Sequence, residues 1–479
     1  MFYPSKADYI KLAASHDVVP IYREAIADVE TPVSVLQRFV DKTNAFLFES
    51  LEGGETWGRY SFVGIDPQLL LEVDHKEGAT GGFDALRSVY AGLRVAEIPG
   101  LPRFFGGAVG VFGYEAIGEF ERMPVPKPGR KGVVPRSRFL KVDKLIVFDN
   151  VRHTIKVVFC TQAKDGGDPA ARYDATCQQI DAVIAALPEY VPAPTQSYPP
   201  VTFETNMTKA DFVGMVNRAR EYIVEGDIIQ AVLSQRFSAR TDVPPLQLYR
   251  ALRLTNPSPY TFFLKLGDQT LVGSSPEVMV RLTGSRVEVR PIAGTRPRGA
   301  TEQLDRELAS ELLSDEKEKA EHVMLVDLGR NDIGRVAEPG SVQVTDFMVI
   351  ERYSHVMHIV SHVEGILRRG LDALDVLKAT FPAGTLSGAP KIRAMQIIHE
   401  LEPSPRGAYG GAVGYISYTG NMDFAITIRT LDVEDGVVSV QAGAGVVYDS
   451  NPEREYEETC HKSKGMRKAV DLALNGLAL

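Results

Sequence analysis

The chain has 479 residues, of which 44% are hydrophobic and 24% charged, and a net charge of −9. These values are typical of a globular protein of roughly two to four domains. The acidic balance, with no long Lys/Arg block, argues against a nucleic-acid partner. Three cysteines without CxxC spacing fit a reducing compartment. The N-terminal segment lacks a signal-peptide pattern, and no stretch of about 18 apolar residues occurs. We therefore expect a soluble, cytoplasmic protein without membrane segments.

Residues 1–190 mix helical and strand-like patterns. The segment from 190 to 200 then holds four prolines and no charge, which predicts an extended linker. We place this linker at 191–206 and a second region at 207–479. Sheets could still pack across the linker.

Beyond the linker, Thr208–Glu225 is expected to be a helix, with Thr208 as N-cap and Asp211 completing a weak capping box. A charged helix is expected from about Glu302 to Leu328 and a final helix from about Pro452 to Leu474. Strand-like runs occur at 228–240, 261–267, 270–284, 286–294, 347–365, 411–420, 424–436 and 437–449. This irregular alternation predicts an α+β fold with large sheets and helices segregated around them.

The run RPIAGTRPRG from Arg290 to Gly299 combines two prolines, two glycines and three arginines without an acid. Proline and glycine disfavour a helix interior or a central strand. The run is therefore predicted to be a cationic loop, of the kind that binds carboxylates or phosphates.

Two acidic pairs have helical spacing. Glu318 and Glu321 share one helix face, and Glu455 and Glu458 repeat the arrangement in the last helix. Either pair alone is most often a solvated face. Facing each other, however, the two pairs would form an oxygen-only site suited to Mg²⁺, which could bind a substrate carboxylate.

Three histidines, His355, His358 and His362, lie in a segment rich in β-branched residues, which predicts a strand. On a strand His355 points away from the other two, so a zinc site is not expected. His358 is either a packed core histidine, which the sequence alone favours, or a single acid/base group in a pocket.

Two small-residue turns could let a ligand approach the backbone. Residues 384–391 (GTLSGAPK) precede an amphipathic helix and could bind an anion, although an ordinary loop-to-helix entry is the better interpretation of that segment alone. Residues 441–445 (QAGAG) end a strand and could equally contain a β-bulge.

Nine segments, in this order, resemble the chorismate-utilising enzymes, and among them the large subunits (component I) of anthranilate synthase. They are GSSPE (273–277), RPIAGTRPRG (290–299), EHVMLVDLGRND (321–332), RYSHVMHIVSHVEG (352–365), GTLSGAPK (384–391), GAYGGAVGY (407–415), IRT (428–430), QAGAGVVYDS (441–450) and the EYEE of the last helix. The resemblance implies mostly antiparallel sheets that form a sandwich with helices outside. It also implies a lyase that makes anthranilate and pyruvate from chorismate and ammonia with Mg²⁺, in tryptophan biosynthesis.

The resemblance also implies residue roles. Glu277 would protonate the departing C4 hydroxyl, and His358 and Thr385 would line that pocket. Tyr409 and Arg429 would hold the enolpyruvyl carboxylate. The ring carboxylate would lie on Mg²⁺. The groups that would assist it there are Gly294, Thr295, Gly443, Gly445 and Lys462, and the metal-site acids would be Glu318, Glu321, Glu455 and Glu458.

Two positions distinguish reactions within this family. The aminodeoxychorismate synthases of folate synthesis commonly carry a nucleophilic lysine where this chain has Ala293. The isochorismate and salicylate synthases use a basic lysine at the position aligned with Gln230. With neither lysine present, external ammonia is the expected nucleophile. Component I of aminodeoxychorismate synthase is the alternative enzyme, and a tryptophan-binding regulatory subunit with an inactive site is a further alternative.

The N-terminal region, 1–190, resembles the tryptophan-sensing part of these enzymes. The implied inhibitor contacts are Glu49, Ser50, Asn256, Pro257 and Tyr260. Many relatives have methionine at Thr261, so the strength of inhibition is left open. No cysteine lies in a glutaminase-like elbow, so ammonia is expected from a separate glutamine amidotransferase subunit in a hetero-oligomer.

Overall fold

The computed structural model describes residues 1–51, 58–75, 81–124, 127, 136–163, 166–188, 195–353 and 356–478. Within these residues the strands form two large sheets, of 13 and 10 strands, built from antiparallel pairs. The predicted α+β class, with mostly antiparallel sheets, is confirmed.

The first sheet runs, in order of hydrogen-bonded neighbours, through β1 (Phe2–Tyr3), β2 (Val18–Ile26), β9 (Thr154–Gln162), β8 (Lys144–Asp149), β4 (Tyr60–Gly64), β3 (Asn44–Glu49), β12 (Tyr260–Leu266), β13 (Gln269–Ser275), β22 (Thr430–Glu434), β23 (Val437–Val446), β11 (Gln230–Arg240) and β10 (Glu204–Thr205), with β19 (Gly388–Ala389) also paired to β11. The second runs through β16 (Ile292–Pro297), β18 (Val356–Ile366), β15 (Arg286–Val289), β14 (Val278–Thr283), β21 (Met422–Ile426), β20 (Ala412–Ser417), β6 (Gly107–Phe112), β7 (Arg136–Val142) and β5 (Gln68–Asp74), with β17 (Gln343–Arg352) also paired to β18.

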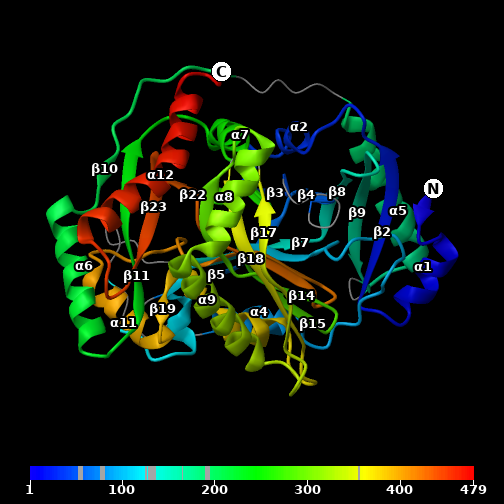
Figure 1. Ribbon diagram of the computed structural model, residues 1–479. Coiled ribbons are helices and arrows are strands. Elements are labelled where there is room, and N and C mark those ends of the chain that lie inside the picture. The colour runs from blue at the N-terminus through cyan, green and yellow to red at the C-terminus, as the bar shows by residue number, and fades with distance from the viewer. Residues whose placement is uncertain are drawn as a thin grey trace.

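Helices surround the sheets (Figure 1). At one end α1 and α5 pack on β2 and β9, and at the other α6 and α11 pack on β11, while α12 packs on β23 and α9 on β18. The described helices are α1 (Lys6–Ala13), α2 (Pro32–Leu36), α4 (Gly82–Tyr90), α5 (Pro169–Ala186), α6 (Lys209–Val224), α7 (Pro245–Thr255), α8 (Glu302–Ser314), α9 (Glu316–Gly334), α10 (Ala373–Thr380), α11 (Lys391–Leu401) and α12 (Pro452–Leu474), with the 3₁₀ turns η1 (Tyr114–Glu119) and η4 (Gly384–Leu386).

Both sheets combine strands from before and after the Pro-rich segment. β3 pairs with β12 in the first sheet, where Phe48 lies opposite Phe262. β6 pairs with β20 in the second, where Val111 lies opposite Val413. Apolar side chains of the two sheets meet in one core cluster that contains Phe46 and Val109. Each fully buried side chain of this kind stabilises the fold by about 1.5–3 kcal/mol.

Several predicted elements are confirmed. The Thr208 side chain accepts from the Asp211 N–H while the Asp211 carboxylate accepts from Thr208 N–H, which forms the expected capping box of α6. The last helix runs from Pro452 to Leu474. The histidine segment is strand β18, with His358 and His362 both buried, whereas His355 lies outside the described residues.

Other expectations require correction. The single helix expected over 302–328 is two helices. The backbone of Asp315 turns to an extended conformation and ends α8, and its side chain caps α9 by accepting from Lys317 and Glu318 N–H. The run 270–284 is split between β13 and β14 at Pro276 and Glu277. The runs 286–294 and 347–365 likewise each contain parts of two strands.

The Arg290–Gly299 run also differs from the predicted loop, because part of it forms strand β16. This strand lies at the end of its sheet. A proline at the boundary of such a strand removes few hydrogen bonds between strands. It pairs with β18 around an irregularity between Ala293 and Thr295. Gly294, at this point, has φ +67°, a conformation that favours glycine.

Candidate active site

Glu277 lies where the chain passes from one sheet to the other. It follows β13 and precedes β14, and its carbonyl accepts from Ile426 N–H at 3.1 Å. Burial raises the pKa of its carboxyl group to about 7, against the lowering effect of the Thr385 hydroxyl and of the Arg429 and Lys462 charges. The structure thus places Glu277, Thr385, Arg429 and Lys462 together, with an acid that is half-protonated near neutral pH.

Arg429 supplies a positive charge without an ion-pair partner among the described residues. Its backbone has φ +47°, and its carbonyl accepts from Ser274 N–H at 3.1 Å, which fixes the residue beside β13. Desolvation by burial lowers the pKa of its guanidinium, while Glu277 raises it. A half-buried guanidinium without a direct ion pair can bind a carboxylate.

Tyr409 lies beside the small residues of β23. A Cβ added to Gly443 would be 2.8 Å from the Tyr409 hydroxyl, and one added to Gly445 would be 2.6 Å from the Gln230 amide nitrogen. Any side chain at these two glycines would therefore displace its neighbour. Lys462 donates to the Gly443 carbonyl at 3.1 Å, which ties α12 to the same strand.

The irregularity at Gly294 orients His358. The His358 Nδ1 lies 3.0 Å from the Gly294 carbonyl and 3.0 Å from the Thr295 hydroxyl. Because a carbonyl can only accept, Nδ1 carries the hydrogen, and in the neutral ring Nε2 is then the acceptor. His358 is therefore held in one tautomer by the two residues predicted beside it.

The two acidic pairs are brought together from α9 and α12. Burial and the negative charges of Glu318 and Glu458 raise the pKa of Glu321, although part of its side chain is exposed. Burial also raises the pKa of Glu455, with a further contribution from Glu458. Lys462 is ion-paired with Glu458 at 2.6 Å, and Arg296 with Glu318 at 3.4 Å.

These four acids suit a divalent cation for two reasons. They offer only oxygen atoms as ligands, and a bound cation would relieve the repulsion between their negative charges. Their ligand atoms are less tightly grouped than those of Glu288, His362 and Glu364, which lie within 4.8 Å of one another. That second group is neutralised differently: His362 Nε2 is 3.2 Å from Glu288, and Arg286 pairs with Glu364.

Each arginine of the predicted cationic loop bonds to acids of the chain itself. Arg290 pairs with Glu351. Arg296 bonds to Glu311 and Asp315 as well as Glu318. Arg298 is 2.7 Å from Asp305. The run therefore braces α8 and α9 against β16, and Gly294 and Thr295 are its members that contact His358.

Three of the expected tryptophan contacts line a cavity of about 890 Å³ that is separate from Glu277. Glu49, Ser50 and Tyr260 belong to its wall, together with Thr261, whereas Asn256 and Pro257 precede that wall at the end of α7. Glu49 is already engaged, because it accepts from the Tyr249 hydroxyl and from Arg253 at 3.0 Å. Glu277 and Thr385 line a separate and much smaller cavity of about 50 Å³.

The sequence analysis missed the residues that support the site from behind. Glu402 and Arg406 are 4% and 3% exposed and form a buried ion pair next to the Tyr409 turn. Only the position of Arg406 immediately before Gly407 could have drawn attention to it. Charged side chains are normally exposed, and no local pattern marks those that are buried.

Comparisons with known proteins show which family the chain resembles. Residues 43–468 match the family model of chorismate binding enzymes. Anthranilate synthase component 1 of Pseudomonas putida is 47% identical to the chain, over 98% of the chain and 99% of that protein. The same-named protein of Aquifex aeolicus is 46% identical, over 97% of each.

Among solved structures, anthranilate synthase component I from Streptococcus pneumoniae superimposes with a TM-score of 0.75 at 39% identity, covering 92% of this chain and 98% of that one. Among the described helices, none combines the length and apolar composition needed to cross a membrane. The match across most of the chain, together with relatives of this similarity, decides the family: the chain belongs to the chorismate binding enzymes.

Proposed function

We propose that this chain is the component of an anthranilate synthase that converts chorismate and ammonia to anthranilate, pyruvate and water, in the first step of tryptophan biosynthesis. Curated relatives of that name match over nearly the whole chain. The single observation that supports the chemistry best is the Glu277 carboxyl, whose pKa is raised to about 7 beside the Arg429 guanidinium. We place the reaction in the cytoplasm.

In this proposal Arg429 and the Tyr409 hydroxyl hold the enolpyruvyl carboxylate. Glu277, in its protonated form, gives its proton to the C4 hydroxyl, which leaves as water while ammonia attacks C2 of the ring. His358, whose Nδ1 donates to the Gly294 carbonyl, would line the pocket of the departing hydroxyl. Loss of the C2 proton and of pyruvate then makes the ring aromatic, and the reaction balances.

Glu318, Glu321, Glu455 and Glu458 would hold Mg²⁺. When bound, the ion would neutralise the ring carboxylate of chorismate. Lys462, bonded to Gly443 and Glu458, would keep α12 and β23 at the distance that this carboxylate requires. The positive charge of Lys462 also partly offsets the rise that burial causes in the pKa of Glu277, Glu321 and Glu455. The lysine therefore acts both on the proposed proton donor and on the proposed metal ligands.

Ala293 supports anthranilate over aminodeoxychorismate as the product. It is 9% exposed and lies opposite Ile359, and its methyl group cannot attack the ring. Anthranilate is fluorescent and 4-amino-4-deoxychorismate is not, so one fluorescence assay separates the two products. Chromatography of the product mixture would overturn the proposal if it showed aminodeoxychorismate alone.

We propose that the chain has three functional regions. These are a tryptophan-sensing region at 1–190, a linker at 191–206 and a chorismate-binding region at 207–479. The cavity of about 890 Å³ lined by Glu49, Ser50 and Tyr260 would accept tryptophan as an inhibitor. A chorismate assay with and without tryptophan tests this role, and Tyr260→Ala should weaken inhibition more than turnover.

Ammonia would come from a separate glutamine amidotransferase subunit. The purified chain should therefore form anthranilate from chorismate with Mg²⁺ and ammonium but not with glutamine, and glutamine should become effective when the partner subunit is added. Equal activity with glutamine alone would contradict the need for a partner.

A further inference from the structure

A buried ion pair between Arg406 and Glu402 lies next to residues of the proposed chorismate pocket. Arg406 donates through Nη2 to Glu402 Oε1 at 2.7 Å and through Nε to Glu402 Oε2 at 3.0 Å. This two-pronged geometry is the strongest that a guanidinium and a carboxylate form. Burying both charges is costly unless their remaining hydrogen bonds are made, so the other partners of the pair indicate its purpose.

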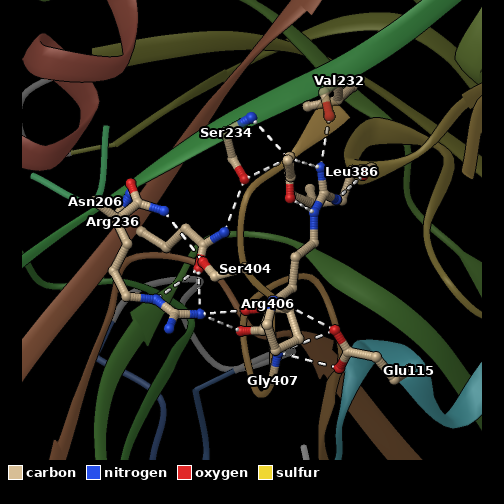
Figure 2. Close-up of polar contacts among 12 residues, drawn as sticks. Glu115, Asn206, Val232, Ser234, Arg236, Leu386, Ser404, Arg406 and Gly407 are labelled. Atoms are coloured by element: carbon tan, nitrogen blue, oxygen red, sulfur yellow. Dashed lines mark hydrogen bonds and ion pairs between the residues drawn. The ribbon is translucent and has the colours of Figure 1, made fainter. Parts of the chain in front are cut away.

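The remaining Arg406 donors reach η4, which carries Thr385, and β11, which pairs with the strand that carries Gly443 and Gly445 (Figure 2). Nη1 donates to the Leu386 carbonyl at 2.5 Å and Nη2 to the Val232 carbonyl at 2.6 Å. Leu386 directly follows Thr385 in η4. Val232 lies opposite Gly445 across β11 and β23. One side chain therefore fixes the distance between the Thr385 turn and the Gly445 strand.

Glu402 extends the same network to Gly443. Its Oε1 accepts from Ser234 N–H at 2.8 Å and from the Ser234 hydroxyl at 2.7 Å. Ser234 lies opposite Gly443, and its hydroxyl also accepts from the Gln441 amide at 2.8 Å. The carboxylate thus holds β11, the strand paired with Gly443, which lies next to the Tyr409 hydroxyl.

The turn that carries Tyr409 is fixed at Arg406 as well. The guanidinium lies over the Tyr409 ring at 5.5 Å and over the Tyr114 ring at 4.5 Å. The Glu115 carboxylate accepts from the backbone N–H of Arg406 at 2.7 Å and of Gly407 at 3.1 Å (Figure 2). The Tyr409 turn is therefore held both by Glu115, which precedes the Pro-rich segment, and by Arg406, which follows it.

We propose that Arg406, together with Glu402, is a positioning residue for chorismate binding, an inference that rests on the proposed function. Its guanidinium donates to protein acceptors, so it acts through the groups it holds: Thr385, Tyr409, Gly443 and Gly445. These groups surround the substrate carboxylates and the departing hydroxyl in the proposed mechanism. The pair sets their spacing, and chorismate affinity depends on that spacing.

Arg406→Lys tests the inference, because a lysine keeps the charge but cannot bridge two carbonyls and a carboxylate at once. Arg138→Lys is the matched control: Arg138 is also buried, at 4% exposure, and donates to the Leu266 carbonyl and to Asp268 from strand β7. Steady-state kinetics with Mg²⁺ and ammonium, and thermal unfolding, are measured for both variants.

We expect Arg406→Lys to raise the KM for chorismate about tenfold or more, equivalent to about 1.4 kcal/mol of binding free energy, while the KM for ammonium changes less than about twofold. The control should lower the unfolding temperature comparably yet leave the KM for chorismate within about twofold. A folded Arg406→Lys enzyme with an unchanged KM for chorismate overturns the inference, as does an equal rise in the control.

Glu402→Gln carries the test if the lysine variant does not fold. This variant keeps the volume and two hydrogen-bonding atoms of the side chain but removes its charge. We again expect a rise in the KM for chorismate. An unchanged KM overturns the inference. A wild-type enzyme that makes no anthranilate overturns the proposed function and the inference with it. An active wild type with unchanged variants overturns the inference alone.

Discussion

At the scale of single residues, the site depends on groups whose protonation is set by burial. Glu277 and Glu115 are both partly buried glutamates whose pKa desolvation raises to about 7. Glu115 meets backbone N–H groups of Arg406 and Gly407, whereas Glu277 faces Thr385, Arg429 and Lys462. The same desolvation therefore accompanies a structural contact at Glu115 and, in the proposed mechanism, a proton donor at Glu277.

Replacement of Glu277 by Gln should reduce kcat by about 10²–10⁴-fold, because an amide cannot donate the required proton, with little change in KM. Since the protonated acid is the donor, wild-type kcat should fall as the pH rises through about 7. Fluorescence assays of anthranilate formation from pH 6 to 9 measure both effects. Unchanged turnover in the Gln variant would show that Glu277 is not the acid.

The raised pKa of Glu277 also affects stability. Its stabilising contribution is present below its unfolded pKa and is lost as the pH rises through its folded pKa of about 7. The unfolding temperature of Glu277→Gln, relative to wild type, should therefore be higher at pH 8 than at pH 5. Glu119→Gln, at another glutamate whose pKa is raised by burial, should show a stability trend of the same sign without loss of activity.

At the scale of elements, the irregularity at Gly294 joins the strand pair β16–β18 to helix α9. A Cβ on Gly294 would be 3.0 Å from Leu312 Cδ1 and 3.2 Å from Glu318 Oε2. The positive φ is thus combined with close approach to a proposed metal acid. Gly284, in the turn between β14 and β15, has φ +59° but open space around its Cα.

Gly294→Ala and Gly284→Ala should each lower the free energy of unfolding by about 1–2 kcal/mol through backbone strain. Only Gly294→Ala should raise the Mg²⁺ concentration that gives half-maximal activity, because only its new methyl group displaces Glu318. Urea unfolding and Mg²⁺ titrations of activity make the comparison. An identical Mg²⁺ requirement in both variants would separate Gly294 from the metal site.

Helices α9 and α12 carry like charges that act on one another, because the negative charge of Glu458 on α12 raises the pKa of Glu321 on α9. The pKa values of Glu321 and Glu455 are raised, so their contribution to stability is lost as the pH rises through those values. Addition of Mg²⁺ should raise the unfolding temperature by relieving this repulsion, and more at pH 8 than at pH 5. At 100 times its Kd the ion would contribute about 2.7 kcal/mol. Calorimetry with EDTA and with Mg²⁺ measures the shift, and Glu321→Gln should reduce it.

At the scale of the whole molecule, the sheets are continuous across the Pro-rich segment. β12 is bonded to β3 and β20 to β6, so separating residues 1–206 from 207–479 would expose the edges of both sheets and much of the core. In Figure 1 the early strands β3 and β7 appear in the middle of the view, among later strands such as β18. The two regions are therefore expected to fold together.

Expression of residues 207–479 alone should give an insoluble or unfolded polypeptide, because the loss of β3 and β6 removes interior strands. Co-expression with residues 1–206 should restore soluble protein. Circular dichroism and sedimentation of the soluble fractions check both outcomes. A folded, monomeric 207–479 fragment would show that the shared sheets are dispensable.

The sequence predicted several elements because their signals are local. The Thr208–Asp211 capping box and the period of β18 depend on neighbouring residues, and both are confirmed. The break at Asp315 was missed, since an aspartate inside a charged run resembles one more exposed acid until its side chain is seen to cap α9. The composition of residues 290–299 predicts a loop where strand β16 forms, because the pairing of this strand with β18 involves residues about 60 positions away.

By itself, the sequence determined the fold class, the family and the residue types available for chemistry, because ordered motifs and hydrophobic periods are written along the chain. Only the tertiary structure decided which charges are paired. The three arginines of RPIAGTRPRG are bonded to acids of the chain, Arg429 has no ion-pair partner in the described part, and Arg406 is buried behind the site. Burial and pairing depend on contacts between segments distant in sequence, and those contacts set the pKa of Glu277.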